Sequence, residues 1–365
     1  MKLLLIRRDN IGDLVCTTPM IRALRRHFPA ARIDALVNSY NQPVLAYNED
    51  LDHVYAYTKA KHRQPGATVA GVHWRRLKLM LALRREHYDM VILANRGDAI
   101  RPLRLARWVA PRTIVGFVPV GVARTGIDLG VPLDAVTRHE VENAFRLLAP
   151  LGIEGTPPGL HLVAAPEARK RAQALLAGQP WHSSQQLVVA IHISARKLRQ
   201  RWPAERFAGL MQRLHAEFAC QFLLFWSPGD EENRLHPGDD RKAAAILTAT
   251  RNLPVLGYPT QRLDELIGGL SVCQAMVCSD GGAMHIGAAL GLPIVCFFGN
   301  SDPRVWHPWQ IPHIVLQKPS RDVNDISVAD AVEAVARLRE QSGPAQRETP
   351  LMRLVPVGTD ADIDQ

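Results

Sequence analysis

The sequence predicts an α/β fold made of two domains, each built on a parallel β-sheet. In both halves of the chain, short apolar segments alternate with amphipathic ones, which is the pattern of buried strands joined by crossover helices. A proline-rich segment at residues 157–167 separates the two halves, and the length of 365 residues suits two domains that each bury a core. We therefore expect two Rossmann-like domains, at residues 1–160 and 161–340, facing each other across a cleft, and a flexible tail at 341–365.

The first half opens with a strand, a polar turn and a helix. Residues 2–7 (KLLLIR) predict a buried strand, residues 8–13 (RDNIGD) a turn, and residues 17–28 an amphipathic helix. Asp13 is therefore expected at the carboxyl end of the strand and near a helix start. An acidic residue in this position is often there only because the helix dipole favours it, so a structural role stands beside a catalytic one.

The rest of the first half combines further strands with a basic segment. Strands are expected at residues 32–37, 53–57, 89–94 and 113–115, and a closing helix at 138–148. The segment at 59–86 is rich in Lys, Arg and His, and within it residues 74–85 (WRRLKLMLALRR) pair an apolar stripe with a basic face. Such a helix either covers a domain core, which is the commoner use, or lies on an anionic membrane surface.

The second half repeats the alternation. Residues 187–193 and 221–226 predict strands, and residues 204–218 and 327–340 predict amphipathic helices. Neither half contains a G-x-G-x-x-G dinucleotide fingerprint or a G-x-x-x-x-G-K-[ST] phosphate loop, which argues against a nicotinamide enzyme or an ATPase.

A glycine-rich turn lies within residues 275–299, between a predicted strand and a short helix that leads to another strand. This βαβ arrangement puts the turn at the carboxyl edge of a parallel sheet. There the free N–H groups of the helix N-terminus favour a phosphate, and Gly281 and Gly282 permit its close approach. Asp280 and His285 flank the turn and are placed to hydrogen-bond a sugar hydroxyl. The plain alternative is a tight turn with Asp280 as a helix cap.

Charge and cysteine content narrow the class of protein. The formal net charge of +9 indicates an acidic partner. No zinc-finger spacing or RNP-type aromatic motif accompanies it, so nucleic acid ranks below an anionic lipid or a phosphorylated sugar. The five cysteines show no paired or metal-like spacing, and we expect them to be reduced and structural, with no bound metal. No signal peptide or membrane-spanning apolar run is evident, so a cytoplasmic protein is expected.

Two motifs resemble those of the ADP-heptose:lipopolysaccharide heptosyltransferases, glycosyltransferase family 9. Residues 279–299 (SDGGAMHIGAALGLPIVCFFG) resemble the donor-site signature of the family, with Gly281 where Thr or Ser is usual and Gly287 where Ala is usual. Residues 6–21 (IRRDNIGDLVCTTPMI) resemble the opening element, in which an aspartate is the proposed general base. The positions that match this opening element are Asp13, Thr17 and Pro19.

Three further segments extend the resemblance. Residues 199–207 (RQRWPAERF) resemble the K-x-W-P segment, whose lysine is expected near the donor phosphates. Gln200 occupies that position here, so the charge would come from another residue: Arg199, Arg201 or Lys197. Residues 226–234 resemble a G-x-x-x-E turn that would bring Glu232 or Glu231 near a ribose or base, although adjacent acids in a loop are commonly just solvated. Residues 300–309 (NSDPRVWHPW) resemble the G-x-[ST]-x-P element.

The resemblance implies a GT-B type fold and an inverting glycosyltransferase. Its donor would be a nucleotide sugar, with ADP-heptose as the family expectation, and its acceptor a lipid-linked saccharide of the lipopolysaccharide core. It would need no metal or other cofactor and would work in the cytoplasm or peripherally at the inner membrane. Asp13 would deprotonate the acceptor hydroxyl, while backbone amides at Gly281, Gly282 and Ala283 would stabilise the departing diphosphate.

The resemblance also implies that the final helix returns to brace the first domain. Two other functions remain open from the sequence. One is a sugar-nucleotide epimerase or hydrolase, which needs no lipid acceptor. The other is a non-catalytic sugar-nucleotide-binding protein, which the glutamine at position 200 favours and the retention of Asp13 disfavours.

Overall fold

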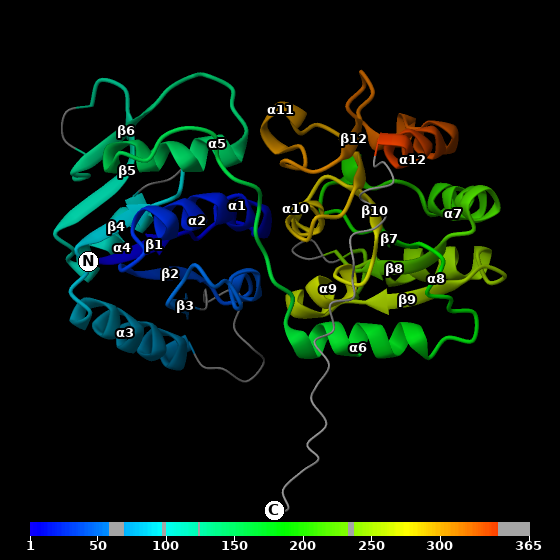
Figure 1. The fold of residues 1–365 in the computed structure, drawn as a ribbon, viewed down its shortest axis with the longest axis horizontal. Helices are drawn as coiled ribbons and strands as arrows, with labels where there is room; N and C mark the ends of the chain where they lie inside the picture. Colours follow the sequence, from blue (N-terminus) through cyan, green and yellow to red (C-terminus); the bar gives the residue numbers. More distant parts are fainter. Residues whose placement is uncertain (58–68, 97–99, 123–124, 233–236, 342–365) are drawn as a thin grey trace, which may run out of the picture.

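The structure is a computed structural model, and it describes residues 1–57, 69–96, 100–122, 125–232 and 237–341. These residues form two six-stranded sheets in which every strand pair is parallel (Figure 1). The strand orders are β3-β2-β1-β4-β5-β6 and β12-β11-β10-β7-β8-β9, which are the same doubly wound order used twice. Each sheet has one switch point, between β1 and β4 in the first and between β7 and β10 in the second, where ligands of such folds bind.

The first sheet contains β1 (Lys2–Ile6), β2 (Arg32–Asn38), β3 (His53–Tyr57), β4 (Met90–Leu93), β5 (Thr113–Pro119) and β6 (Leu129–Leu133). Its helices are α1 (Ile11–Val15), α2 (Thr18–His27), α3 (Val69–Arg85), α4 (Ile100–Val109) and α5 (Glu140–Phe145), with short 3₁₀ turns at η1 (Gln42–Val44) and η3 (Arg146–Leu151).

The second sheet contains β7 (Val188–His192), β8 (Gln221–Trp226), β9 (Val255–Pro259), β10 (Ala275–Ser279), β11 (Ile294–Phe297) and β12 (His313–Leu316). Its helices are α6 (Pro166–Ala177), α7 (Ala204–Phe218), α8 (Asp240–Ala249), α9 (Leu263–Leu270), α10 (Gly282–Ala289), α11 (Pro303–Trp306) and α12 (Val328–Gln341), with 3₁₀ turns at η4 (Leu198–Gln200) and η5 (Val323–Asp325).

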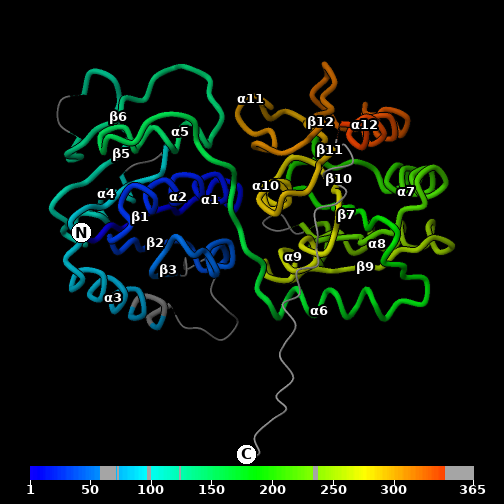
Figure 2. The backbone as a smooth tube through the Cα atoms, viewed as in Figure 1, coloured from blue at the N-terminus to red at the C-terminus, as the bar shows by residue number. Residues whose placement is uncertain are grey.

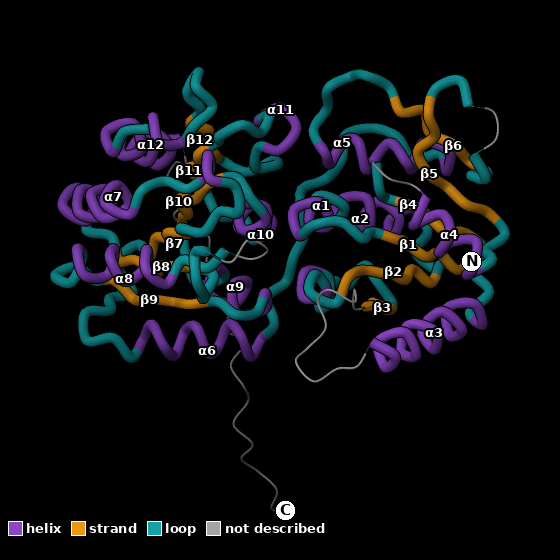
Figure 3. The backbone as a smooth tube through the Cα atoms, turned by 180° about the vertical axis from the view of Figure 1, so that it is seen from behind, coloured by secondary structure: helices purple, strands orange, loops and turns teal. Residues whose placement is uncertain are grey.

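Both sheets are covered by helices on both faces, as their nearly continuous apolar strands require. In the first domain, α3 and α4 bury one side of each helix against one face of the sheet. The opposite face packs against α1, α2 and α5, and its core continues across the domain junction to α6, α9 and α10. The far face of the second sheet packs against α7, α8 and α12. Figure 3 shows these layers from behind.

Among the described residues, the chain passes once between the domains, through residues 152–165, and this segment runs along the domain junction in Figure 2. The helix at 327–340 does not return to the first domain, contrary to expectation. α12 instead packs against α7, β11 and β12, and its buried residues Ala331, Val332 and Leu338 join the core of the second domain. The apolar face that predicted the helix therefore finds its partner locally.

Two elements of the first domain were not predicted, namely α4 and β6. Pro102 near the start of α4, and Gly130 and Pro132 within β6, are residues that weaken a helix or strand pattern in sequence. The predicted turn at residues 8–13 also contains a short helix, α1, because Asn10 begins a capping box there. The predicted tail at 341–365 begins at Gln341, the last residue of α12, and its remainder lies outside the described residues, as does part of the basic segment at 59–86. Within the described ranges, no helix is long and apolar enough to cross a bilayer.

Candidate functional site

The β1–α1 loop of the first domain and the β10–α10 turn of the second lie at the two switch points, and α1 contacts α10 across the domain junction. Two glycines make this contact possible. A Cβ atom at Gly12 would lie 2.7 Å from Cδ2 of His285, and one at Gly282 would lie 3.0 Å from Cβ of Ile11. A larger residue at Gly12 would require the buried ring of His285 to move, and one at Gly282 would require Ile11 to shift by a few tenths of an ångström, so the two glycines favour the close approach of the predicted motifs.

Asp13 lies in the first turn of α1, with 17% of its side chain exposed. Its Oδ1 accepts a hydrogen bond of 3.1 Å from Nη2 of Arg7. Its Oδ2 accepts bonds of 3.1 Å from both the backbone N–H and the side-chain amide of Asn10, which completes the capping box. Asp13 therefore has the structural role that the sequence left open, and its side chain remains accessible at the domain junction.

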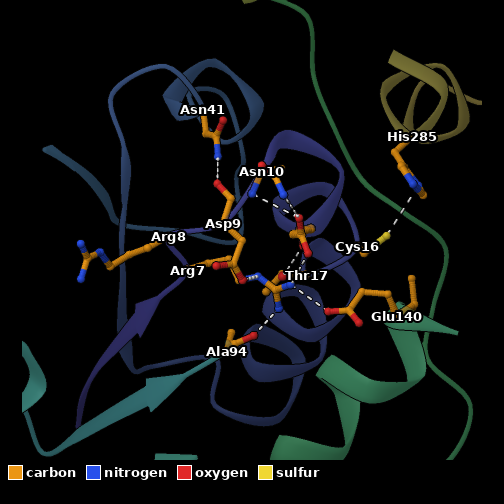
Figure 4. A network of polar contacts seen from close by, with 12 residues as sticks. Arg7, Arg8, Asp9, Asn10, Cys16, Thr17, Asn41, Ala94, Glu140 and His285 are labelled. Atoms are coloured by element: carbon orange, nitrogen blue, oxygen red, sulfur yellow. Dashed lines mark hydrogen bonds and ion pairs between the residues drawn. The ribbon is translucent and has the colours of Figure 1, made fainter. Parts of the chain in front are cut away.

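Arg7 organises the charges around Asp13. The side chain is 1% exposed, and Nη2 lies 2.8 Å from Oε1 of Glu140 while it also donates to Asp13 (Figure 4). Burial alone would lower the pKa of Arg7, but the attraction of Glu140, Asp13 and Asp9 outweighs it and raises the pKa. Burial raises the pKa of Glu140, and its pairing with Arg7 offsets part of that rise. A permanently charged guanidinium therefore fixes the position of the Asp13 carboxylate.

The β1–α1 loop between Arg7 and Asp13 is anchored by side chains of a neighbouring segment. The carbonyl oxygen of Asp9 accepts hydrogen bonds from the side chains of Asn38 at 3.1 Å, Tyr40 at 2.9 Å and Asn41 at 3.0 Å. Thr17 donates its hydroxyl to the carbonyl of Asp13 at 2.8 Å and is the N-cap of α2, and Pro19 follows in the first turn. The family-like positions Thr17 and Pro19 are thus explained by the α1–α2 junction.

Asp280 lies directly after β10 and is bridged to two other motifs. Nε2 of Gln200 donates to Oδ2 of Asp280 at 2.8 Å and to the hydroxyl oxygen of Ser301 at 3.0 Å. The three residues come from three of the four segments that resemble the family in the second half of the chain. Gln200 is 5% exposed, so a neutral amide takes the place next to Asp280 where the family pattern has a lysine. Trp202 of the same segment is fully buried and donates to the carbonyl of Ile326.

The N-terminus of α10 is where the sequence predicts an anion, and that role stays a prediction. No side chain caps α10, and nothing lies within 4 Å of the position where a Cβ of Gly281 would be. Its first-turn N–H groups therefore have no side-chain acceptor, and a phosphate is able to approach the turn. A hydroxyl-bearing residue would fit at Gly281. At Gly287, by contrast, a Cβ would meet the Sδ of Met276 at 2.6 Å, so Met276 occupies the space that an alanine there would need.

His285 faces the first domain. It is 2% exposed, its Nδ1 lies 3.6 Å from Sγ of Cys16, and burial lowers its pKa, so the ring is neutral. Figure 4 shows Cys16 and His285 pointing toward each other across the junction. All five cysteines are buried and unpaired, consistent with the predicted structural role.

The other predicted site residues are spread around the η4 loop and the β8–α8 loop. Lys197 and Arg199 are exposed. Arg201 donates from Nε to the carbonyl of Ala195 at 2.9 Å, and its Nη2 lies 3.9 Å from Asp239. Glu232 is exposed, and its backbone N–H donates to Asp230. None of these charges has a recorded ion pair or hydrogen bond to Asp280 among the described residues, so their roles at a donor stay predictions.

Sequence reasoning missed Arg7, Glu140 and Ser301 as individual site residues. Arg7 stood in the quoted opening motif, but a strand-terminal arginine carries no signal of burial. Glu140 is 127 residues from Asp13 in the chain, and only the fold brings the two near Arg7.

A second contact between the domains involves His139. Its Nε2 lies 2.9 Å from the carbonyl oxygen of His307, and its Nδ1 accepts from the N–H of Val141 at 3.1 Å, which caps α5. The ring therefore carries its proton on Nε2. It stacks on the indole ring of Trp309, with 4.7 Å between the ring centroids. Burial lowers the pKa of His139 to about 3.

Acidification is expected to weaken this junction. Because the folded pKa of His139 lies below its ordinary value of 6.5, its stabilisation is complete above pH 6.5 and is lost as the pH falls toward 3. Between pH 7 and pH 5 the loss is about 2 kcal/mol. His139→Asn keeps a capping oxygen for Val141 and removes the titrating ring. Denaturant titrations at pH 7 and pH 5 should show that the unfolding free energy of the variant depends less on pH than that of the unmodified protein. Equal losses of unfolding free energy in the two proteins would contradict the assignment of the pH effect to His139.

Comparisons with known proteins agree with these motifs. Residues 76–323, more than half of the chain, match the profile of Glycosyltransferase family 9 (heptosyltransferase). The chain is 25% identical over 357 residues to lipopolysaccharide heptosyltransferase 3 of Escherichia coli, a match that covers 91% of this chain and 97% of the relative.

Solved structures show the same fold. The glycosyl transferase family 9 structure from Veillonella parvula DSM 2008 has a TM-score of 0.77 at 21% identity, covering 93% of this chain and 98% of that one. The E. coli ADP-heptose lps heptosyltransferase II has a TM-score of 0.73 at 20% identity, covering 94% and 99%. The predicted GT-B type fold is therefore confirmed.

Proposed function

The chain belongs to glycosyltransferase family 9, and we propose that it transfers a heptose from ADP-heptose to the lipopolysaccharide core or a related glycolipid. The observation that carries the proposal is the match to a lipopolysaccharide heptosyltransferase along nearly the whole of both chains. The donor is taken from the name of the similar E. coli enzyme, an ADP-heptose lps heptosyltransferase. These likenesses favour transfer over the epimerase, hydrolase and purely binding alternatives.

In the proposed reaction, Asp13 accepts the proton of an acceptor hydroxyl as its oxygen bonds to the anomeric carbon. The bond from that carbon to the diphosphate breaks on the opposite face, which inverts the configuration and releases the nucleoside diphosphate. The uncapped N–H groups at Gly281, Gly282 and Ala283 are suited to the charge that grows on the diphosphate. No metal or other cofactor enters the proposal.

Gln200 stands where the family pattern has a lysine, and this difference affects how the donor is bound. A glutamine amide gives Asp280 a hydrogen bond but no counter-charge, so the acidic group at the turn is compensated less than it would be by lysine. The exposed Lys197 and Arg199 lie on η4 or beside it, where either is able to supply a cation to a bound diphosphate. We propose that these residues take the part of the missing lysine.

The function is tested by incubating the purified protein with a panel of nucleotide sugars, with and without lipopolysaccharide-core acceptors. We expect nucleoside diphosphate release that depends on both ADP-heptose and a core acceptor. Release without any acceptor would indicate hydrolysis, and no release with any donor and acceptor pair would overturn the proposal.

Asp280→Ala should weaken donor binding by roughly ten- to a hundredfold, the usual value of hydrogen bonds to a charged group. The substitution removes the carboxylate that orders Gln200 and Ser301 around the turn. Calorimetric titration with ADP-heptose or ADP measures the effect, and His285→Ala tests the second predicted contact in the same way. Asp322→Ala is the matched control, because it removes a helix-capping aspartate of the same domain far along the chain. Unchanged affinity in folded Asp280→Ala would reduce Asp280 to a packing role.

The proposed acceptor is attached to a lipid, so the enzyme would work at the cytoplasmic surface of the inner membrane. Nothing in the donor-site geometry accounts for how the protein reaches that surface.

A further inference from the structure

A basic pocket lies on the outer face of the first domain, between α3 and α4. Its volume is about 540 Å³, and four arginines and four apolar residues line it: Arg8, Arg76, Leu77, Met80, Arg101, Arg104, Leu105 and Trp108. Figures 1 and 3 show α3 at the periphery of this domain. Arg8 lies in the β1–α1 loop, five residues before Asp13 on α1, so one pocket residue is close in the chain to the proposed general base.

The described residues of helices α3 and α4 carry charge of one sign. Helices α3 and α4 together contain eight Lys and Arg residues and no Asp or Glu. Arg76, Arg101 and Arg104 are exposed, and within the described ranges no carboxylate lies within 4 Å of any of them. Several cations around a concave site attract an anionic ligand. Arginine forks in particular match the geometry of phosphate.

The same face exposes large apolar side chains between the cations. The exposed fractions are 58% for Trp74, 39% for Leu77, 40% for Leu81, 62% for Ile100 and 46% for Trp108. These residues are not needed for the core, because α3 and α4 already bury Met80, Leu83, Leu105 and Val109 against the sheet. Tryptophans beside arginines are typical of surfaces that meet the headgroup region of a bilayer.

The two helices form one surface and not two independent ones. Nη1 of Arg84 on α3 donates to the carbonyl oxygen of Trp108 on α4 at 3.0 Å, and their apolar sides share one core cluster. A soluble phosphate would account for the arginines but not for the tryptophans and leucines that surround them. The combination fits an anionic lipid, which offers a phosphate and an apolar layer at once.

We propose that the α3–α4 face docks on an anionic bilayer and that the pocket holds the phosphate of a lipid headgroup. The inference rests on this surface alone and does not require the proposed function. If both hold, docking through a pocket that includes Arg8 brings the Asp13 loop to the membrane where a lipid-linked acceptor is located. Both roles that the sequence offers for residues 74–85 then apply, because α3 covers the core with one side and faces the bilayer with the other.

The test is co-sedimentation of the full chain with vesicles of phosphatidylglycerol and phosphatidylcholine, or of phosphatidylcholine alone. Arg101→Gln with Arg104→Gln should weaken binding to the anionic vesicles roughly thirtyfold, from the usual contribution of an arginine near an anionic surface. The matched control is Arg213→Gln with Arg337→Gln, which removes two exposed arginines from α7 and α12 of the second domain and should change binding less than about twofold. Trp108→Ala should weaken binding at high salt, where the electrostatic part is screened.

Three outcomes would overturn the proposal. Equal binding to neutral and anionic vesicles would show that the negative charge of the lipid is not recognised, and equal losses in the two arginine pairs would show that only the net charge of the protein matters. Binding of inorganic phosphate that Arg101→Gln with Arg104→Gln abolishes, without any binding to vesicles, would assign the pocket to a soluble ligand. No donor or acceptor enters the assay, so failure here leaves the proposed function untouched.

Discussion

Asp13→Asn is expected to lower turnover by roughly 10²–10⁴, the usual size of a general-base contribution, while the affinity for the donor stays nearly unchanged. An amide does not accept a proton at neutral pH, so the acceptor hydroxyl would have to attack without a base. The fold should survive, because the amide oxygen of asparagine is able to replace the carboxylate as acceptor for the N–H of Asn10. Single-turnover kinetics with saturating donor measure the chemical step, and calorimetric titration measures donor affinity.

Asp9→Asn is the matched control for this prediction. Asp9 lies in the same loop, and its Oδ2 is 3.2 Å from Nε of Arg7, so the substitution also removes one negative charge beside the same guanidinium. Its turnover should fall less than tenfold if the base is Asp13, since general-base catalysis is specific to the group that takes the proton. A folded Asp13→Asn enzyme with near-normal turnover would end the assignment and leave Asp13 with its capping role only.

The fold could be predicted from the sequence because its strands are short, apolar and separated by clear helix patterns. The prediction was correct where the apolar period was strong, as at α7, whose bounds match the predicted helix at 204–218. It missed α4 and β6, where Pro102, Gly130 and Pro132 disturb the local pattern and tertiary packing decides the structure. In the second domain it also missed α6, α8, β9, α9, α11 and β12. The location of α12 was wrong because an apolar helix face indicates burial but not which domain provides the partner.

The candidate site could be predicted only as separate motifs. Asp13, Asp280 and the glycines were identified because turns at strand ends leave a local signal in sequence. The contacts that join them have no such signal. Nothing local indicates that Gln200 bonds to Asp280, that Gly12 makes room for His285, or that the α4 arginines complete a pocket with α3. These are contacts between segments far apart in the chain, and they can be identified only from the folded structure.

Arg7→Met should cost about 3–5 kcal/mol of unfolding free energy at pH 7, because it leaves the 4%-exposed Glu140 without its counter-charge. With Arg7 gone, burial raises the pKa of Glu140 further, so this group destabilises the variant above its folded pKa and the loss shrinks as the pH falls. Denaturant titrations at pH 7 and pH 5 measure both effects. Arg262→Met, which breaks an exposed pair with Asp264, is the control and should cost no more than about 1 kcal/mol.

The double variant Arg7→Met with Glu140→Gln separates stability from catalysis. Replacing both partners removes the buried charge, so much of the stability should return. Turnover should not return, because Asp13 still lacks the guanidinium that fixes its Oδ1. If turnover recovers together with stability, Arg7 serves the fold alone. If stability stays low while the single Glu140→Gln variant is stable, the bond from Arg7 to the carbonyl of Ala94 matters more than the pair with Glu140. Recovered stability without recovered turnover would identify Arg7 as the residue that positions the proposed base.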